Sequence, residues 1–169
     1  ARHVGKVVIR QADRPVAGPL GIHANGTYLI TGALGGIGLQ LLRWLADQGA
    51  RSLVLVARSV AHPSAEAQAV LRQLEGQGVR CLPLALDLAA TGSAALQAER
   101  QLSTALSQLP SDQPLRGVFH AAGVLDDGLL EWQTPERLAA VLAPKLCGWQ
   151  ILRAALEQAS CEPEVVVQF

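Results

Sequence analysis

The sequence contains no methionine, and aromatic residues make up only 4% of its 169 positions. A chain without methionine does not begin at a translation start, so we expect it to be a piece of a longer protein. Few aromatic rings argue against the stacking platforms that bind single-stranded nucleic acid. Lys plus Arg (14) equal Asp plus Glu (14), so no excess of positive charge would attract a polyanion. We therefore expect no binding of nucleic acid.

Cysteine is scarce, and long apolar runs are missing. The three cysteines, Cys81, Cys147 and Cys161, form no CxxC pair and have no histidine at metal-ligand spacing. We expect no metal and no disulfide, and reduced thiols indicate a cytoplasmic protein. No apolar run reaches the roughly 20 residues of a membrane span, and no signal-peptide pattern is present. Half of the residues are nevertheless apolar and only 17% are charged, which predicts a globular domain with a large core.

From residue 27 onward, short apolar runs alternate with segments of helical periodicity. The predicted strands are Thr27–Thr31, Ser52–Ala57, Val79–Leu86, Leu115–Ala121 and Glu164–Phe169. The predicted helices are Ile37–Gln48, Ser64–Gly76, Ser93–Leu109 and Pro135–Ala159. We expect the last helix to break near Ala143–Pro144, because proline disfavours helical geometry in the residue before it. The alternation predicts an α/β fold, a Rossmann-type doubly wound parallel sheet of five strands with helices on both faces, incomplete at the C-terminus.

The first 26 residues do not share this rhythm. Residues 11–26 are rich in proline, glycine and polar side chains, which is typical of a linker. Before them, Gly5–Arg10 (GKVVIR) could be a strand of a different unit. The predicted nucleotide-binding domain therefore occupies residues 27–169.

The sharpest local signal is the segment Thr31–Gly38 (TGALGGIG), which lies between a predicted strand and a predicted helix. A dinucleotide diphosphate binds backbone N–H groups at a helix N-terminus, and side chains there would block its approach. Glycine permits both a tight turn and this close approach. The spacing fits TGxxxGxG rather than GxGxxG, which favours the short-chain dehydrogenase version of the motif; an ordinary glycine-rich turn is the alternative.

Charged residues follow the next two strands. Arg58 and Ser59 end the second strand, where this architecture places the adenosine ribose. An arginine there can pair with a 2′-phosphate, whereas an acid would accept from a 2′-hydroxyl, so the sequence favours NADPH over NADH. Asp87 follows the third strand, where its carboxylate could accept from the adenine amino group. A solvated surface arginine and a helix-capping aspartate are the alternatives.

Further candidates lie at the end of the fourth strand and in the last helix. The small residues of Ala121–Gly123 would let the cofactor pass close to the backbone. We interpret His120 as a packed strand-end histidine rather than a proton carrier. Lys145 lies in an otherwise apolar helix opening, and its spacing alone does not separate a catalytic from a solvated lysine.

Three ordered motifs together resemble the ketoreductase domain of modular polyketide synthases. They are the segment at residues 26–59 (GTYLITGALGGIGLQLLRWLADQGARSLVLVARS), the segment at 116–130 (RGVFHAAGVLDDGLL) and the segment at 135–152 (PERLAAVLAPKLCGWQIL). The resemblance implies NADPH-dependent reduction of a β-ketoacyl group on an acyl carrier protein to a β-hydroxyacyl thioester. Residues 1–10 (ARHVGKVVIR) are similar to the tail of an enoylreductase domain, which would make that domain and the ketoreductase structural subdomain its neighbours.

The resemblance also assigns roles to individual residues. Lys145 matches the lysine of the family's catalytic set, and Leu125, Asp126 and Asp127 match the Leu-Asp-Asp fingerprint associated with B-type hydroxyl stereochemistry. The expected cofactor contacts are Thr31, Gly32, Leu34, Gly35, Gly36, Ile37, Gly38, Arg58, Ser59, Asp87, Leu88, Ala121, Ala122 and Gly123.

The chain departs from the family pattern at its end. The family's catalytic serine follows the fifth strand and its general-acid tyrosine lies farther on, whereas this chain ends at Phe169 and its one tyrosine is Tyr28. We therefore expect the isolated chain to be inactive, unless the 169 residues are a stretch of a longer, active domain. Two other interpretations stay open: an NADP-dependent short-chain reductase or epimerase acting on a free small molecule, and a non-catalytic NADP-binding or structural module.

Overall fold

The computed structural model describes residues 21–169, so the predicted tail at residues 1–10 and most of the predicted linker at residues 11–26 lie outside the described residues. The strands are β1 (Thr27–Thr31), β2 (Ser52–Ala57), β3 (Arg80–Ala85), β4 (Leu115–His120) and β5 (Val165–Gln168). The helices are α1 (Gly36–Asp47), α2 (Ala65–Gly76), α3 (Gly92–Ser107) and α4 (Pro135–Gln158), with a 3₁₀ turn, η1, at Leu130–Trp132.

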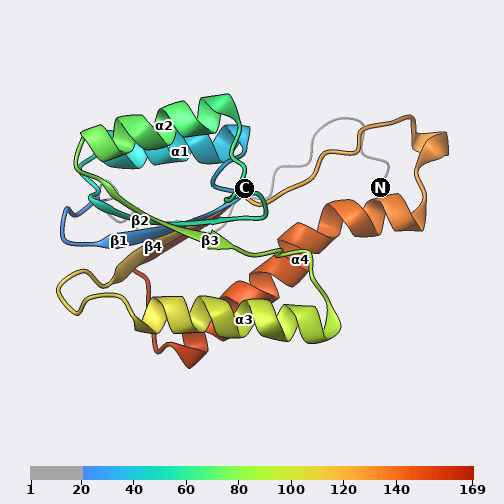
Figure 1. Cartoon of the computed structure of the whole chain (residues 1–169). Helices are drawn as coiled ribbons and strands as arrows, with labels where there is room; N and C mark the ends of the chain where they lie inside the picture. Colours follow the sequence, from blue (N-terminus) through green and yellow to red (C-terminus); the bar gives the residue numbers. More distant parts are fainter. Residues whose placement is uncertain (1–20) are drawn as a thin grey trace, which may run out of the picture.

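All five strands run parallel in the order β3-β2-β1-β4-β5. Helices α1 and α2 cover one face of this sheet, and α3 and α4 cover the other (Figure 1). The chain moves outward from β1 to β3 and then crosses back to β4 on the other side of β1. This reversal leaves a crevice at the carboxyl ends of β1 and β4, which is where doubly wound sheets bind ligands. The predicted fold class is confirmed.

Successive side chains of the central strands point alternately into two hydrophobic cores, one on each face of the sheet. Tyr28 and Ile30 of β1 pack against α1 and α2, whereas Leu29 between them packs on the opposite face. On that face Leu102 of α3 and Leu152 of α4 are fully buried. A strand covered on both faces needs apolar residues at every position, which explains the uninterrupted runs of β1 and β2.

The predicted break in the last helix is wrong, because α4 is continuous. It runs unbroken from Pro135 to Gln158, with Pro144 inside it, where the sequence predicted a break near Ala143–Pro144. Proline removes one backbone donor, which leaves the carbonyl of the residue four positions earlier without its helical partner. That residue, Ala140, is exposed, so water can take the partner's place. The buried ring of Pro144 adds packing, and the helix continues.

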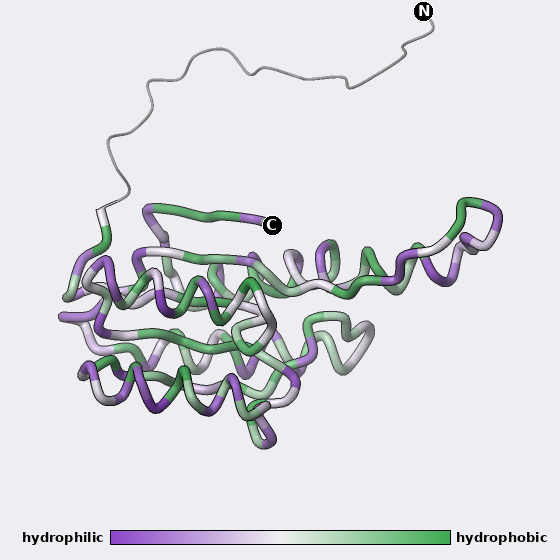
Figure 2. The backbone as a smooth tube through the Cα atoms, turned by 90° about the horizontal axis from the view of Figure 1, so that it is seen from above, coloured by the Kyte–Doolittle hydropathy of each residue, from purple (hydrophilic) through white to green (hydrophobic). Residues whose placement is uncertain are grey.

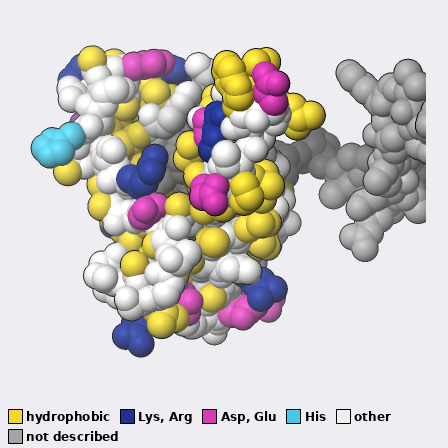
Figure 3. All heavy atoms as spheres, turned by 90° about the vertical axis from the view of Figure 1, so that its right-hand side faces the viewer, with side chains coloured by type: hydrophobic (Ala, Val, Ile, Leu, Met, Phe, Trp, Pro, Cys, Tyr) yellow, Lys and Arg dark blue, Asp and Glu magenta, His cyan; other side chains and the backbone are white. Residues whose placement is uncertain are grey.

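The second half of α4 lies in the core, while the first half projects from the body together with the loop before it. We call residues 123–146 the arm (Figures 1 and 2). It carries most of the large apolar side chains that are exposed in the described part of the chain. These are Leu125, Leu129, Leu130, Trp132, Leu138, Leu142 and Leu146. Figure 3 looks onto this side of the molecule, where hydrophobic side chains gather next to acidic and basic ones.

Candidate active site

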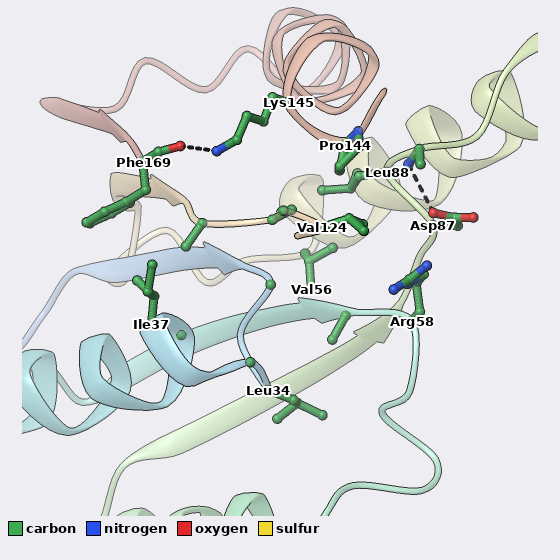
Figure 4. A pocket seen from close by; sticks show the side chains of 18 of the residues that line it. Leu34, Ile37, Val56, Arg58, Asp87, Leu88, Val124, Pro144, Lys145 and Phe169 are labelled. Carbon is green, nitrogen blue, oxygen red and sulfur yellow. Dashed lines mark hydrogen bonds between the residues drawn. The ribbon is translucent and has the colours of Figure 1, made fainter. Parts of the chain in front are cut away.

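A cavity of about 560 Å³ lies in the crevice where the strand order reverses. Its walls come from the residues that follow β1, β2, β3 and β4, together with the turn of α4 that holds Pro144 and Lys145. Figure 4 shows Arg58 and Asp87 at one end of this cavity and Lys145 and Phe169 at the other. An extended ligand with a charged end is therefore the kind of molecule that the cavity fits.

The floor of the cavity is the N-terminus of α1. Gly35 occupies the N-cap position without a side-chain hydrogen bond, and the first turn contains no acidic residue. By contrast, α2 is capped by Ser64 and α4 by Thr134, whose side chains accept from backbone N–H groups. The first N–H groups of α1 thus lack intrahelical acceptors and face a cavity, an arrangement that favours an anion such as a diphosphate.

Two glycines allow the backbone to fold this tightly. Gly32 has a φ of +63°, and a Cβ on it would lie 2.6 Å from the Ala121 carbonyl oxygen. A Cβ on Gly38 would lie 2.2 Å from the Gly32 carbonyl oxygen, well inside contact distance. Gly36 differs, because a Cβ there would meet no atom within 4 Å. Gly36 lines the cavity, and the open space beside it leaves room for the diphosphate of a dinucleotide.

The charged end of the cavity holds both residues predicted to meet the adenosine half. Arg58 is exposed, and no ion pair joins it to another described residue. Asp87 accepts a hydrogen bond from Ala89 N at 3.0 Å through Oδ1, which stabilises a turn. It does not cap α3, the alternative left open by the sequence, because Thr91 occupies the N-cap position of that helix. A carboxylate has two oxygens and several acceptor sites, so this bond leaves Oδ2 able to accept from a ligand.

The opposite end of the cavity is formed by Lys145. Its Nζ donates a hydrogen bond to the Phe169 carbonyl oxygen, and it lies close to Gly123. The single tyrosine of the chain is elsewhere: Tyr28 is buried, does not line the cavity, and its hydroxyl oxygen accepts from His23 N at 2.6 Å. Among the described residues that line the cavity, Lys145 therefore has the one ionisable side chain at this end.

Beneath the cavity, His120 links the sheet to α4. The side chain is 3% exposed, and its Nδ1 lies 2.7 Å from the Thr31 hydroxyl oxygen. Its Nε2 lies 3.4 Å from the Lys145 carbonyl oxygen, which can only accept, so Nε2 carries the proton and the Thr31 hydroxyl donates to Nδ1. Thr31 Oγ1 in turn accepts from Ala122 N at 3.1 Å. Burial lowers the pKa of His120, which fits the interpretation of a packed, neutral histidine.

The loop predicted to carry stereochemical information leaves the cavity at Leu125. The next residue, Asp126, pairs with Arg137 of α4, and this partner holds the pKa of the Asp126 carboxyl below its usual range. Asp127 is exposed and forms no ion pair with another described residue. Neither aspartate lines the cavity.

The structure brings almost all the predicted site residues together. The predicted residues that line the cavity are Gly32, Leu34, Gly35, Gly36, Ile37, Gly38, Arg58, Ser59, Asp87, Leu88, Ala121, Ala122, Gly123, Leu125 and Lys145. Thr31 does not, because its hydroxyl turns inward to His120 and Ala122. The sequence prediction missed seven lining residues: Val56, Ala57, Leu86, Ala89, Val124, Pro144 and Phe169. All except Phe169 lie within two positions of a predicted site residue, so extending each motif by one or two residues would have found six of the seven.

Residues 21–169 contain no group of three His, Cys, Asp or Glu side chains able to hold a metal ion. No helix in this range is long and apolar enough to cross a bilayer. The three cysteines are unpaired there, and burial, reinforced by Glu75, raises the pKa of Cys81 to about 11.

Comparisons with known proteins agree with this geometry. The KR domain family model matches residues 26–169. The chain is 32% identical over 157 residues to highly reducing polyketide synthase cm3B of Cordyceps militaris, covering 87% of this chain and 6% of that protein. It is 41% identical over 147 residues to polyketide synthase GfsB of Streptomyces halstedii, covering 86% of this chain and 2% of that protein. The chain thus spans only a small part of these relatives.

Solved structures show the same relationship. A structure described as A-type ketoreductases from a modular polyketide synthase superposes with a TM-score of 0.73 at 33% identity, covering 95% of this chain and 31% of that one. A short-chain dehydrogenase from Sphingobium yanoikuyae in complex with NADPH superposes with a TM-score of 0.60 at 25% identity, covering 85% of this chain and 52% of that one. The chain belongs to the KR domain family, the ketoreductase domains of polyketide synthases, and has their fold of the short-chain dehydrogenase type.

Proposed function

We propose that this chain is the nucleotide-binding part of a cytoplasmic, NADPH-dependent ketoreductase in a polyketide synthase, which reduces a β-ketoacyl thioester on an acyl carrier protein to a β-hydroxyacyl thioester. The observation that carries the proposal is one cavity with an uncapped glycine turn as its floor, Arg58 at one end and Lys145 at the other. The enoylreductase-like residues 1–10 and the ketoreductase structural subdomain would be neighbours in the same synthase.

The residues divide the work along the cavity. The N–H groups at the start of α1 bind the diphosphate, and Arg58 with Ser59 binds the 2′-phosphate. Asp87 accepts from the adenine amino group, while Ala121–Gly123 let the nicotinamide ribose lie against backbone. Bound NADPH supplies the hydride for the carbonyl carbon of the substrate. Lys145, next to Gly123, orients the ribose and would lower the pKa of a general acid contributed outside the 169 residues.

Coenzyme choice tests this proposal. The substitution Arg58→Ala removes the guanidinium that would pair with the 2′-phosphate, and hydrogen bonds to charged groups are strong enough that we expect NADPH affinity to fall about 10- to 100-fold. NADH affinity should stay within about twofold, because NADH has no phosphate at that position. Titration calorimetry on the 169-residue chain measures both. Equal losses for the two coenzymes, or no loss for either, would refute the assignment of Arg58.

We further propose B-type hydroxyl stereochemistry, supported by the Leu125-Asp126-Asp127 fingerprint. Two solved relatives are described as A-type and A1-type ketoreductases, so likeness of fold does not by itself decide the configuration. Chiral chromatography of the hydroxyacyl product made by the complete synthase decides between them. A product of the A-type configuration would overturn this part of the proposal without affecting the NADPH assignment.

A further inference from the structure

Arg137 makes an unusual number of contacts for a side chain at the start of a helix. It occupies the first turn of α4, where the helix dipole disfavours a positive charge. Its backbone N–H is already used, because it donates to the Thr134 cap at 3.3 Å. The guanidinium bends back toward the preceding loop instead of extending into water. A cation in this position therefore needs a specific partner to be stable.

That partner is the loop of the Leu-Asp-Asp fingerprint. Arg137 Nε donates to Asp126 Oδ2 at 2.8 Å, and Nη2 donates to Asp126 Oδ1. Nη2 also lies 3.3 Å from the Asp126 carbonyl oxygen and 3.2 Å from that of Asp127, and Nη1 donates to the Trp132 carbonyl oxygen at 3.0 Å. A planar guanidinium is the one side chain that can bind a carboxylate through two nitrogens and still reach three carbonyls.

The loop has little else to hold it. Residues 121–129 contain no helix or strand, and among described residues no backbone–backbone hydrogen bond forms between Gly123 and Gly128. A Cβ on Gly128 would lie 3.0 Å from Arg137 Nη1, so the backbone folds closely around the guanidinium. The inner end of the same loop, Gly123 to Leu125, is a wall of the cavity. Fixing the loop therefore fixes that wall.

We propose that Arg137 is a positioning residue, which shapes the substrate end of the cavity by locking the loop through Asp126. Asp126 does not line the cavity, and the guanidinium binds both oxygens of its carboxylate, so Asp126 influences the hydroxyl configuration through loop geometry and does not itself contact the substrate. This inference deepens the proposed ketoreductase function and rests on it for its stereochemical part.

The loop geometry is testable on the 169-residue chain alone. Chymotrypsin cleaves after leucine and tryptophan, and the loop offers Leu125 and Leu129, followed directly by Leu130 and Trp132 of η1. We expect Arg137→Ala and Asp126→Asn each to accelerate cleavage there about tenfold, since opening of the loop limits the rate. Asp127→Asn is the matched control one residue away, and its rate should stay at the wild-type value. Arg137→Lys keeps the charge but loses the planar fork, so it should fall between. Unchanged cleavage in Arg137→Ala, with cut sites located by mass spectrometry, would overturn the locking role.

The stereochemical part is testable in the complete synthase. If Asp126 acts through the loop, Arg137→Ala and Asp126→Ala raise the fraction of the minor hydroxyl configuration to the same extent, and the double variant is no worse than either. NADPH affinity stays at the wild-type value in all three. If Asp126→Ala alters the product ratio while Arg137→Ala does not, Asp126 contacts the substrate and the proposal is wrong. Absence of reduction by the wild-type synthase would instead refute the proposed function, and it would leave the proteolysis result intact.

Discussion

The two halves of α4 have similar apolar content but different surroundings. The second half inserts Ile151, Leu152, Ala155 and Leu156 into the core shared with α3, whereas the first half carries exposed leucines on the arm. Burial orders the second half. A Thr134 cap and the contacts of Arg137 order the first half and its loop. The two halves of this helix thus show that an apolar pattern indicates residues that can be buried. Whether they are buried depends on the elements that surround them.

The largest test compares one leucine from each half. Leu152 is 0% exposed, so Leu152→Ala should lower the free energy of unfolding by about 2–5 kcal/mol. Leu138 is 57% exposed, and Leu138→Ala should change it by no more than about 0.5 kcal/mol. Urea titration of the 169-residue chain measures both. A cost for Leu138→Ala as large as that for Leu152→Ala would show that another surface covers the arm in solution.

A smaller change in stability is expected when a packed and an open glycine of the turn are compared. Gly38→Ala forces a Cβ against the Gly32 carbonyl, and overpacking of this kind costs about 1–3 kcal/mol of unfolding free energy. Gly36→Ala meets no protein atom, so stability should hold or rise slightly because alanine is the better helix former. Its methyl group nevertheless enters the space assigned to the diphosphate.

The Gly36→Ala variant therefore separates an effect on folding from an effect on coenzyme binding. Gly36→Ala should fold normally and lose NADPH affinity, detected as a missing thermal shift on addition of the coenzyme. Wild-type affinity in Gly36→Ala would place the ligand elsewhere in the cavity.

The smallest effect concerns His120, which joins the body to the base of the arm. Burial lowers its pKa from 6.5, so the unfolded chain binds more protons than the folded chain once the pH falls below that value. The contribution of neutral His120 to the free energy of unfolding is complete above about pH 7. It declines as the pH falls through 6.5 toward the pKa of His120 in the folded chain. Denaturant titrations between these limits should show a gentle loss of stability.

Replacing His120 by each of two amide side chains tests its two hydrogen bonds one at a time. His120→Gln can keep the donor toward the Lys145 carbonyl, and His120→Asn can keep the acceptor toward Thr31. Both should flatten the decline between pH 7 and 5 by about 1 kcal/mol or less. A decline of wild-type slope in both variants would assign the pH dependence to another group.

Sequence patterns were sufficient to predict the sheet and the residues that line the charged end of the cavity. The bounds of β1 and β2 agree with prediction, and most other elements agree within one or two residues, because strands buried on both faces leave uninterrupted apolar runs. Arg58 and Asp87 followed from strand ends alone. Parallel strands place their carboxyl ends at one edge, so the topology brings these residues together once the strands are known.

The sequence did not predict the arm, the continuity of α4 or the role of Arg137. The low helix propensity of proline predicted a break at Pro144. The single missing hydrogen bond is outweighed by the packing of Pro144 and of the buried residues that follow it in α4. The contacts of Arg137 join residues up to 11 positions apart through a loop without periodicity. No local pattern encodes such a fold-back, which depends on the loop's path through space.

The close packing of Gly32 on Ala121 has a consequence for how the domain operates. The Gly32 turn, the proposed seat of the diphosphate, lies so close to the Ala121–Ala122 backbone, the proposed border of the nicotinamide, that a methyl group on Gly32 would collide with it. In the proposed NADPH complex, this close packing would fix the position of the coenzyme relative to the end of β4. Hydride transfer requires accurate distances between the reacting atoms, and a seat formed already on folding would supply part of that accuracy.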